Sequence, residues 1–322
     1  MKKIIFTIFT LIICGGLFYY IYPKADEYSD FLAEKIINKP KVTIPIAGKY
    51  AKNDNYGFVQ LTDNFTPYAY QDLLNIIYTI INNRWTSFSF YCPVEYEDCI
   101  DDANHLLNDQ NILTYINDFI HPYNNFISVR SLISPSGMVT IKPSYLYTEE
   151  QIEQIEKKLD EIVAEIINDN DDNRTRIRKM HDYIINNTRY DIVRTNTGQS
   201  QYQSHNAYGL FLENYAICNG YTDAMAIYLS RLNINNYKIS TLAEMINDSD
   251  YGHVWNALFL DGEWLHLDLT WDDPVSDDGK DYLFYKYFLI NNEKLAKADN
   301  GVVVIQEHNY DPIVYLEYNP LA

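Results

Sequence analysis

The spacing of apolar residues in the first half of the chain predicts helices followed by two strands. Apolar side chains recur at helical spacing in residues 73–81 and again in residues 106–119. Two strand-like runs follow at residues 125–131 and 138–146, and a turn-forming Ser-Pro-Ser-Gly sequence at residues 134–137 separates them. We therefore expect mixed α and β structure here. No chemical motif in this part indicates a role.

A strong helix start lies near the middle of the chain. Thr148 and Gln151 have the spacing of a capping box, in which each side chain bonds the backbone N–H of the other residue. An apolar stripe follows over residues 152–167, and the acidic and amide residues 168–172 end it. A second helix is expected over residues 174–187, with its apolar positions facing inward.

These patterns divide the chain into four parts. We expect residues 1–24 to form a signal anchor or signal peptide and residues 25–55 to form a linker. An N-terminal α+β region occupies residues 56–147, and the helix start at Thr148 opens a second domain that spans residues 148–322.

The first part is a candidate membrane segment. Residues 4–22 are almost entirely apolar, and as a helix they would span about 28 Å, close to the hydrocarbon thickness of a bilayer. Lys2 and Lys3 precede them, which predicts that the rest of the chain lies outside the cell. We expect a retained anchor in the cell membrane with an extracellular domain. A cleaved signal peptide and a lipoprotein modified at Cys14 are the alternatives, and both also export the domain.

Two strands joined by a tight turn are predicted late in the chain. Residues 253–260 and 263–270 read as strands, and Asp261-Gly262 between them is a strong hairpin signal. With a two-residue loop, Leu260 lies opposite Glu263. Each residue before Leu260 then lies opposite the residue that is equally far beyond Glu263.

This register brings a histidine and a carboxylate together. Trp255 lies opposite Asp268, which places His253 and Asp268 on one face as diagonal neighbours about 7–8 Å apart at the backbone. An imidazole and a carboxylate can close that gap to a hydrogen bond. His266 shares the same face and is the rival partner. His181 lies in a periodic helix and is interpreted as structural.

A cysteine opens the helix that precedes this hairpin. Cys218 is followed by an apolar helical pattern over residues 224–232. A thiol at a helix N-terminus is favoured as a thiolate, and the free backbone N–H groups there can hold an oxyanion. Burial as a small packing residue is the ordinary explanation for an isolated cysteine. His253 and Asp268 shift the balance, because a thiolate, an imidazole and a carboxylate together perform acyl transfer.

Composition narrows the classes of partner. A formal net charge of −19 argues against nucleic acid and against an anionic membrane surface as a partner, because both need a basic face. The 47% apolar content fits a folded protein.

The other cysteines point to an oxidising compartment. Cys92 and Cys99 are close in sequence, and outside the cytoplasm we expect them to form a disulfide. The chain contains no Cys-x-x-Cys pair, so a structural zinc site is not expected. Cys218 is left as the odd cysteine, a candidate for reactivity.

Three ordered segments resemble the transglutaminase-like superfamily, and upstream sequence at residues 181–191 is similar to the helix before the core in its bacterial branch. The resemblance covers residues 148–291 and rests on the segments Cys218-Asn219-Gly220-Tyr221, Gly252-His253-Val254-Trp255-Asn256 and Asp268-Leu269-Thr270-Trp271-Asp272-Asp273-Pro274. His253 follows Cys218 by 35 residues, against about 130–150 in papain-like proteases.

The resemblance implies an α+β, papain-like core, in which the cysteine-bearing helix packs on an antiparallel sheet. It also implies acyl-enzyme chemistry without cofactor or metal, with Cys218 as nucleophile, His253 as base and Asp268 as orienter. Leu269 stands where many members have proline. No Gln or Trp directly precedes Cys218 as a second oxyanion donor, and Tyr208 or Tyr215 is a candidate substitute.

The expected function is an exported cysteine enzyme that attacks peptide or protein amides through a thioester. Hydrolysis is favoured over crosslinking, because many bacterial members of the family are thought to be hydrolases. The alternative is a non-catalytic cell-surface binding or scaffolding module that retains the fold. A glycopeptide amidase of the same superfamily is a third reading, although such enzymes usually carry zinc-binding cysteine pairs.

Overall fold

A computed structural model describes residues 42–134, 136–241, 252–275, 282–299 and 308–318. Residues 45–322 form one compact unit, so the boundary expected at Thr148 lies inside that unit and stays a prediction. The apolar segment 4–22 and Cys14 lie outside the described residues. Among the residues that are described, no helix has the length and apolar character needed to cross a membrane.

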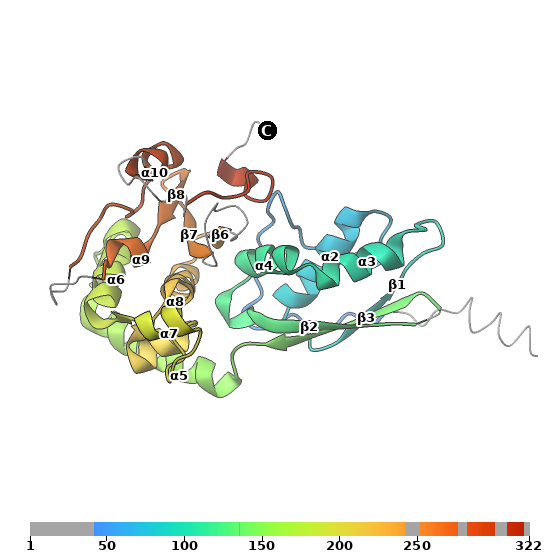
Figure 1. Cartoon of the computed structure of the whole chain (residues 1–322), viewed down its shortest axis with the longest axis horizontal. Helices are drawn as coiled ribbons and strands as arrows, with labels where there is room; N and C mark the ends of the chain where they lie inside the picture. The colour runs from blue at the N-terminus through green and yellow to red at the C-terminus, as the bar shows by residue number, and fades with distance from the viewer. Residues whose placement is uncertain (1–41, 135, 242–251, 276–281, 300–307, 319–322) are drawn as a thin grey trace, which may run out of the picture. The chain divides into compact units, whose positions relative to one another are not determined.

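The N-terminal region combines three helices with a three-stranded antiparallel sheet in the order β1-β3-β2. Its elements are α2 (Tyr70–Asn82), β1 (Phe88–Tyr91), α3 (Cys99–Asn108), α4 (Gln110–Phe119), β2 (Phe126–Ile133) and β3 (Met138–Tyr145). The helices lie on one face of the sheet (Figure 1), where Val139 and Ile141 are buried. The mixed α+β structure expected here is confirmed.

The apolar stretch at residues 106–119 is two helices and not one. Asp109 separates them, and its side chain accepts hydrogen bonds from the backbone N–H groups of Asn111 and Ile112. An aspartate that caps a following helix in this way stops the preceding one, because its own backbone must leave the helical conformation. β2 and β3 pair as neighbours, and between them the backbone N–H of Gly137 donates to the carbonyl oxygen of Ser134 at 3.0 Å, as expected for a turn there.

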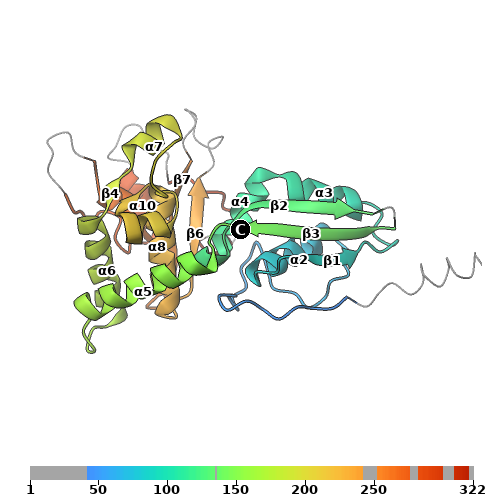
Figure 2. The same ribbon diagram turned by 90° about the horizontal axis from the view of Figure 1, so that it is seen from below.

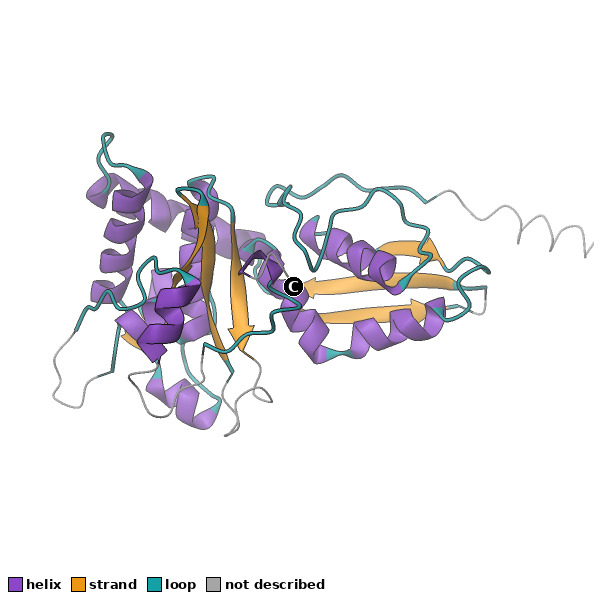
Figure 3. Cartoon of the chain, turned by 90° about the horizontal axis from the view of Figure 1, so that it is seen from above, coloured by secondary structure: helices purple, strands orange, loops and turns teal. Residues whose placement is uncertain are grey.

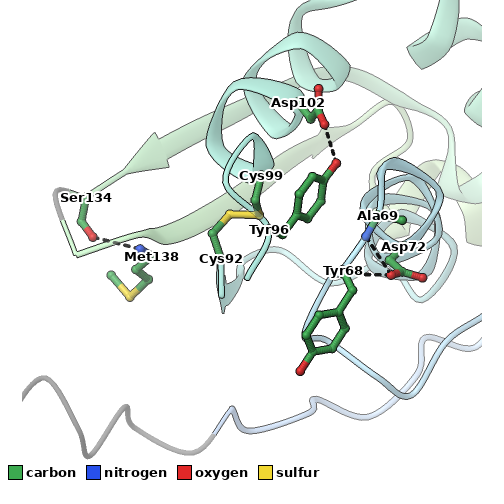
Figure 4. The surroundings of a disulfide bond; sticks show 9 residues. All are labelled: Tyr68, Ala69, Asp72, Cys92, Tyr96, Cys99, Asp102, Ser134 and Met138. Atoms are coloured by element: carbon green, nitrogen blue, oxygen red, sulfur yellow. Dashed lines mark hydrogen bonds between the residues drawn. A yellow bond between two sulfur atoms is a disulfide. The ribbon is translucent and has the colours of Figure 1, made fainter. Parts of the chain in front are cut away.

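Figure 4 shows a disulfide that ties the end of β1 to the start of α3. Cys92 and Cys99 are joined there, with their Cα atoms 5.7 Å apart. Within the short loop between them, the Tyr96 hydroxyl donates a hydrogen bond to Asp102.

The second half is built from helices around another three-stranded antiparallel sheet. Its elements are α5 (Glu149–Ile166), α6 (Asn173–Asn187), β4 (Arg189–Tyr190), α7 (Ile192–Thr197), β5 (Tyr215–Ala216), α8 (Cys218–Arg231), β6 (Asn236–Thr241), β7 (His253–Leu260), β8 (Glu263–Leu267), α9 (Leu269–Asp272) and α10 (Asn292–Asp299). The capping box predicted at Thr148 and Gln151 is confirmed, with both reciprocal hydrogen bonds present.

Strands β6, β7 and β8 pair in that order, and α8 packs on β7 (Figures 2 and 3). The predicted hairpin register is confirmed from Leu260 opposite Glu263 to Asn256 opposite Leu267. Asp261 and Gly262 form its turn with φ of 57° and 88°, the left-handed conformation that this pair of residues tolerates.

The second strand of the hairpin is shorter than predicted. β8 ends at Leu267, and Thr270 lies in α9 and not opposite His253. The cause is Asp268, whose side chain accepts a hydrogen bond from the backbone N–H of Trp271 and so starts a helix. Strand β6 has no counterpart in our prediction, because every residue in it is buried and no alternating pattern marks it.

Candidate active site

Cys218 is the first residue of α8, and the loop before it is held tightly against the helix. The backbone N–H of Ile217 donates to the carbonyl oxygen of Ser204 at 2.8 Å. A Cβ added at Gly220 would lie 2.6 Å from that same oxygen, so only glycine allows this approach. Cys218 keeps a free and partly exposed thiol at the positive end of the helix dipole.

Two hydrogen bonds join α8, which carries Cys218, to β7, which carries His253. The Thr222 hydroxyl donates to the carbonyl oxygen of Val254 at 2.9 Å. The Asn256 side chain donates to the carbonyl oxygen of Thr222, also at 2.9 Å. Both bonds run between the first turns of the helix and the first residues of the strand.

His253 and Asp268 are in direct contact. His253 Nε2 lies 2.6 Å from Asp268 Oδ2, and both residues are buried. The diagonal approach predicted for this pair is therefore present, although Asp268 lies just past the end of β8. With Nε2 bonded to the carboxylate, Nδ1 is the ring nitrogen left to exchange a proton with Cys218.

The opposite charges of His253 and Asp268 stabilise one another. Burial disfavours the imidazolium form of His253, but the Asp268 carboxylate and the Cys218 side chain outweigh burial and hold the pKa of His253 well above its usual value. Burial would raise the pKa of Asp268, but the adjacent imidazoles hold that pKa well below its ordinary range. The structure thus places His253 and Asp268 in direct contact, and the Cys218 side chain contributes to the raised pKa of His253.

His266, the rival partner, is occupied elsewhere. Its Nδ1 accepts a hydrogen bond from Trp255 Nε1 at 3.0 Å, and its ring stacks on Tyr318 with centroids 4.2 Å apart. Burial lowers the pKa of His266 to about 3, so the ring is neutral. A ring that accepts from an indole and is this weakly basic is poorly suited to take a proton from a thiol.

His181 links two helices. Its ring nitrogens lie 3.0 Å from Asp182 and 3.3 Å from Asp272, which joins α6 to α9. Burial lowers the pKa of His181, but the two carboxylates more than reverse this, and the pKa is raised. This geometry fits the structural role expected for it.

Residues 160–269 match the family model described as the transglutaminase-like superfamily, and the matched segment contains Cys218, His253 and Asp268. This segment belongs to the transglutaminase-like superfamily. None of the curated proteins matches the chain.

Two solved structures are similar to the chain at low identity. One is a protein named as a TGase, with 14% identity and a TM-score of 0.31, and the match covers 48% of each chain. The other is a candidate cysteine protease from Cytophaga hutchinsonii, with 15% identity and a TM-score of 0.28, covering 45% of this chain and 62% of the other. The chain thus spans about half to three fifths of their lengths.

A second histidine, which could not be predicted from the sequence, contacts Asp268. His308 Nε2 lies 2.8 Å from Asp268 Oδ2, the oxygen that His253 also contacts. His308 stands 40 residues beyond Asp268, outside the transglutaminase-like segment, with no periodic pattern around it to signal a role.

The three facing side chains are also the kind that bind metals. The nearest ligand atoms of His253, Asp268 and His308 all lie within 4.8 Å of one another. Both Nε2 atoms are at hydrogen-bond distance from the same carboxylate oxygen, so ring protons account for the arrangement.

A cavity of about 210 Å³ opens beside His253. The residues that line it are mostly small and uncharged: Thr114, Asn219, Ser240, Thr241, Gly252, His253 and Val254. Thr114 belongs to α4, so the N-terminal region contributes to the wall of this cavity. Of the two candidate oxyanion donors, Tyr215 stacks on Tyr202 with ring centroids 3.9 Å apart, and Tyr208 packs against the hydrophobic core. Their proposed role stays a prediction.

Proposed function

We propose that this chain is a cysteine acyl-transfer enzyme that attacks the amide bonds of peptides or proteins. The observation that carries the proposal is the buried His253–Asp268 pair facing a free thiol at the start of α8. A structural cysteine has no need of a charged imidazole beside it. A histidine buried only for packing has no need of a carboxylate.

Each residue has a distinct part in the proposed reaction. His253 Nδ1 takes the proton of Cys218, and the sulfur attacks the carbonyl carbon to form a tetrahedral oxyanion that the N–H groups of α8 stabilise. The imidazolium then protonates the leaving amine, and a thioester remains on Cys218. Asp268 holds the ring orientation and stabilises its positive charge throughout.

Water is the proposed acyl acceptor, which makes the enzyme a hydrolase of the protease type. Water attacks the thioester carbon, loses a proton to His253 and releases a carboxylic acid together with the free thiol. A primary amine in place of water would give a crosslink by the same steps. The small neutral residues around the cavity suit an uncharged amide group as substrate. We propose that the reaction takes place outside the cytoplasm, and protease accessibility on intact cells tests that.

Alkylation of the full chain by iodoacetamide tests the nucleophile. Mass spectrometry of the Cys218 peptide separates its reaction from that of Cys14. We expect Cys218 to react faster at about pH 7 than a free cysteine does, because the thiolate is the reacting form. His253→Gln should remove this advantage. Equal rates in the wild type and in His253→Gln would contradict the proposal and favour a binding module.

A pair of assays identifies the acceptor. Release of peptides from a fluorescent casein reports hydrolysis, and incorporation of a fluorescent primary amine into casein reports transfer. We expect hydrolysis to dominate and Cys218→Ser to abolish it, a loss of about 10³-fold or more. Amine incorporation in excess of hydrolysis would assign the chain to the crosslinking class instead.

A further inference from the structure

A histidine outside the transglutaminase-like segment completes the surroundings of Asp268. His308 and His253 approach the same oxygen, Oδ2, at 2.8 and 2.6 Å. The other oxygen, Oδ1, accepts from the backbone N–H of Trp271 at 3.2 Å. A carboxylate oxygen can accept two hydrogen bonds, so the carboxylate is held by three donors from three separate parts of the chain.

The ring of His308 is held in place by aromatic neighbours. It packs edge-on against Trp255 with centroids 4.9 Å apart, and it lies against Tyr287 at 4.7 Å. Its side chain is 1% exposed. A ring so enclosed cannot turn away from Asp268 without disturbing its neighbours, and its orientation is therefore fixed in advance of any substrate.

A buried carboxylate with only one imidazole partner would be less well defined. Its second lone pair on Oδ2 would be desolvated without a donor, which costs free energy and favours rotation of the side chain. Rotation would weaken the bond to His253, because that bond depends on where Oδ2 lies. The N–H of His308 removes this freedom, and its hydrogen bond also helps to keep Asp268 ionised.

We propose that His308 is a positioning residue of the active site: it donates a hydrogen bond from Nε2 to Asp268 and thereby holds the carboxylate against His253. The inference rests on the proposed function of Cys218 and His253. It assigns to the C-terminal segment, which the family match does not cover, a part in the chemistry. His308 acts through Asp268 and not on the substrate.

Two variants separate the hydrogen bond from the packing of the ring. His308→Phe keeps an aromatic ring among the same neighbours but has no donor, whereas His308→Gln keeps an amide donor. We expect His308→Phe to lower kcat by about 10–100-fold with little change in KM, because substrate contacts are untouched. His308→Gln should recover a substantial part of kcat. His105→Phe, at an exposed position of α3, is the matched control.

The pH profile distinguishes positioning from a general loss of stability. Without the donor, the pKa of Asp268 rises, so the acidic limb of kcat/KM should move to higher pH in His308→Phe. Among the titratable groups near these two residues, His253, His266 and Asp272 interact with them electrostatically and Tyr287 packs against the His308 ring. All four are unchanged in the variant. A profile that keeps its shape while activity falls in proportion to the folded fraction would overturn the proposal.

Two further measurements keep this inference separate from the proposed function. Proton NMR of the histidine ring N–H groups should show two Nε2–H signals shifted by the carboxylate, and His308→Phe should lose one and move the other. This readout needs no enzymatic activity. If the wild type is inactive, the proposed function fails while the signals still test His308. Titration with zinc sulfate should show no stoichiometric binding, and binding that disappears in His308→Phe would make His308 a metal ligand instead.

Discussion

At the scale of single residues, Asp268 makes several hydrogen bonds with different structural roles. It follows the last residue of β8, caps α9 through Oδ1, and receives two imidazoles at Oδ2. These bonds explain how a carboxylate can lie in an apolar stretch of sequence at only 2% exposure, because every charge-bearing atom has a donor.

Replacing this carboxylate by an amide should separate charge from shape. Asp268→Asn keeps the size of the side chain but cannot stabilise an imidazolium. We expect amide hydrolysis to fall by about 10²–10⁴-fold, because His253 would lose its charge partner and its preferred tautomer. The control is Asp261→Asn, since Asn-Gly suits the same turn. Equal activity in the two variants would contradict the role of Asp268.

His266 should make stability depend on pH. Its pKa is about 3 in the folded chain, against 6.5 for the ordinary side chain. Above pH 6.5 the ring is neutral in both states, and its full contribution is present. As the pH falls below 6.5, the unfolded chain binds a proton that the folded chain does not, so stability is lost.

The expected loss between pH 6.5 and pH 5 is about 2 kcal/mol. Urea unfolding of the wild type and of His266→Gln at pH 7 and pH 5 measures it. The glutamine variant should show a smaller difference between the two pH values, and His105→Gln should behave as the wild type does. Parallel pH dependence in all three proteins would mean that His266 is not buried as a neutral ring.

The site residues differ in how much of their environment is local. Cys218 could be recognised because a helical pattern begins at it. His253 and Asp268 could be paired because Asp261-Gly262 predicts the turn of the hairpin that carries them. These could be predicted because short-range geometry places them. His308 could not, since its bond to Asp268 depends on how a distant C-terminal segment packs.

At the scale of elements, the junction between α8 and β7 determines the geometry of the site. Thr222→Val keeps the volume of the side chain but leaves the carbonyl of Val254 without its donor. We expect a loss of about 1–3 kcal/mol in the free energy of unfolding. Urea unfolding measures this loss, and exposed Thr66→Val is the control. Activity should fall more than the folded fraction does, and a variant as active as the wild type would show that this bond does not set the spacing.

The helices and the hairpin were predictable from periodicity and from capping and turn residues. The end of β8 was not, because apolar alternation continues past Leu267 while the side chain of Asp268 starts a helix instead. Strand β6 was missed for a different reason. Its polar residues, such as Lys238 and Ser240, are buried and hydrogen-bonded to other elements. Buried and exposed positions therefore do not alternate along it as they do in a half-exposed strand.

At the scale of the whole compact unit, a buried polar network joins the N-terminal region to α8. Asp223 of α8 accepts hydrogen bonds from Asn125, Tyr147 and Lys238. The same region supplies Thr114 to the cavity beside His253. The role of this region could not be predicted from the sequence, because these partners are far apart along the chain and become neighbours only in the fold.

Removing the cation of this network should be costly. Lys238→Met leaves the Asp223 carboxylate buried without its counter-charge, and we expect about 3–5 kcal/mol of destabilisation. Adding Asp223→Asn should recover part of that loss, since the unpaired charge is then gone. Chemical unfolding measures both, with exposed Lys142→Met as the reference. A full loss that persists in the double variant would show that packing, and not charge, is responsible.

The bond between Cys92 and Cys99 has a practical consequence for any work on Cys218. The described residues hold two cysteines joined and one free. Air or peroxide preserves the joined pair, but if Cys218 is the nucleophile proposed above, they oxidise it to sulfenic acid and then to species that do not revert. Strong reductant protects the thiolate but opens the pair. A mild thiol buffer is therefore the condition that serves both.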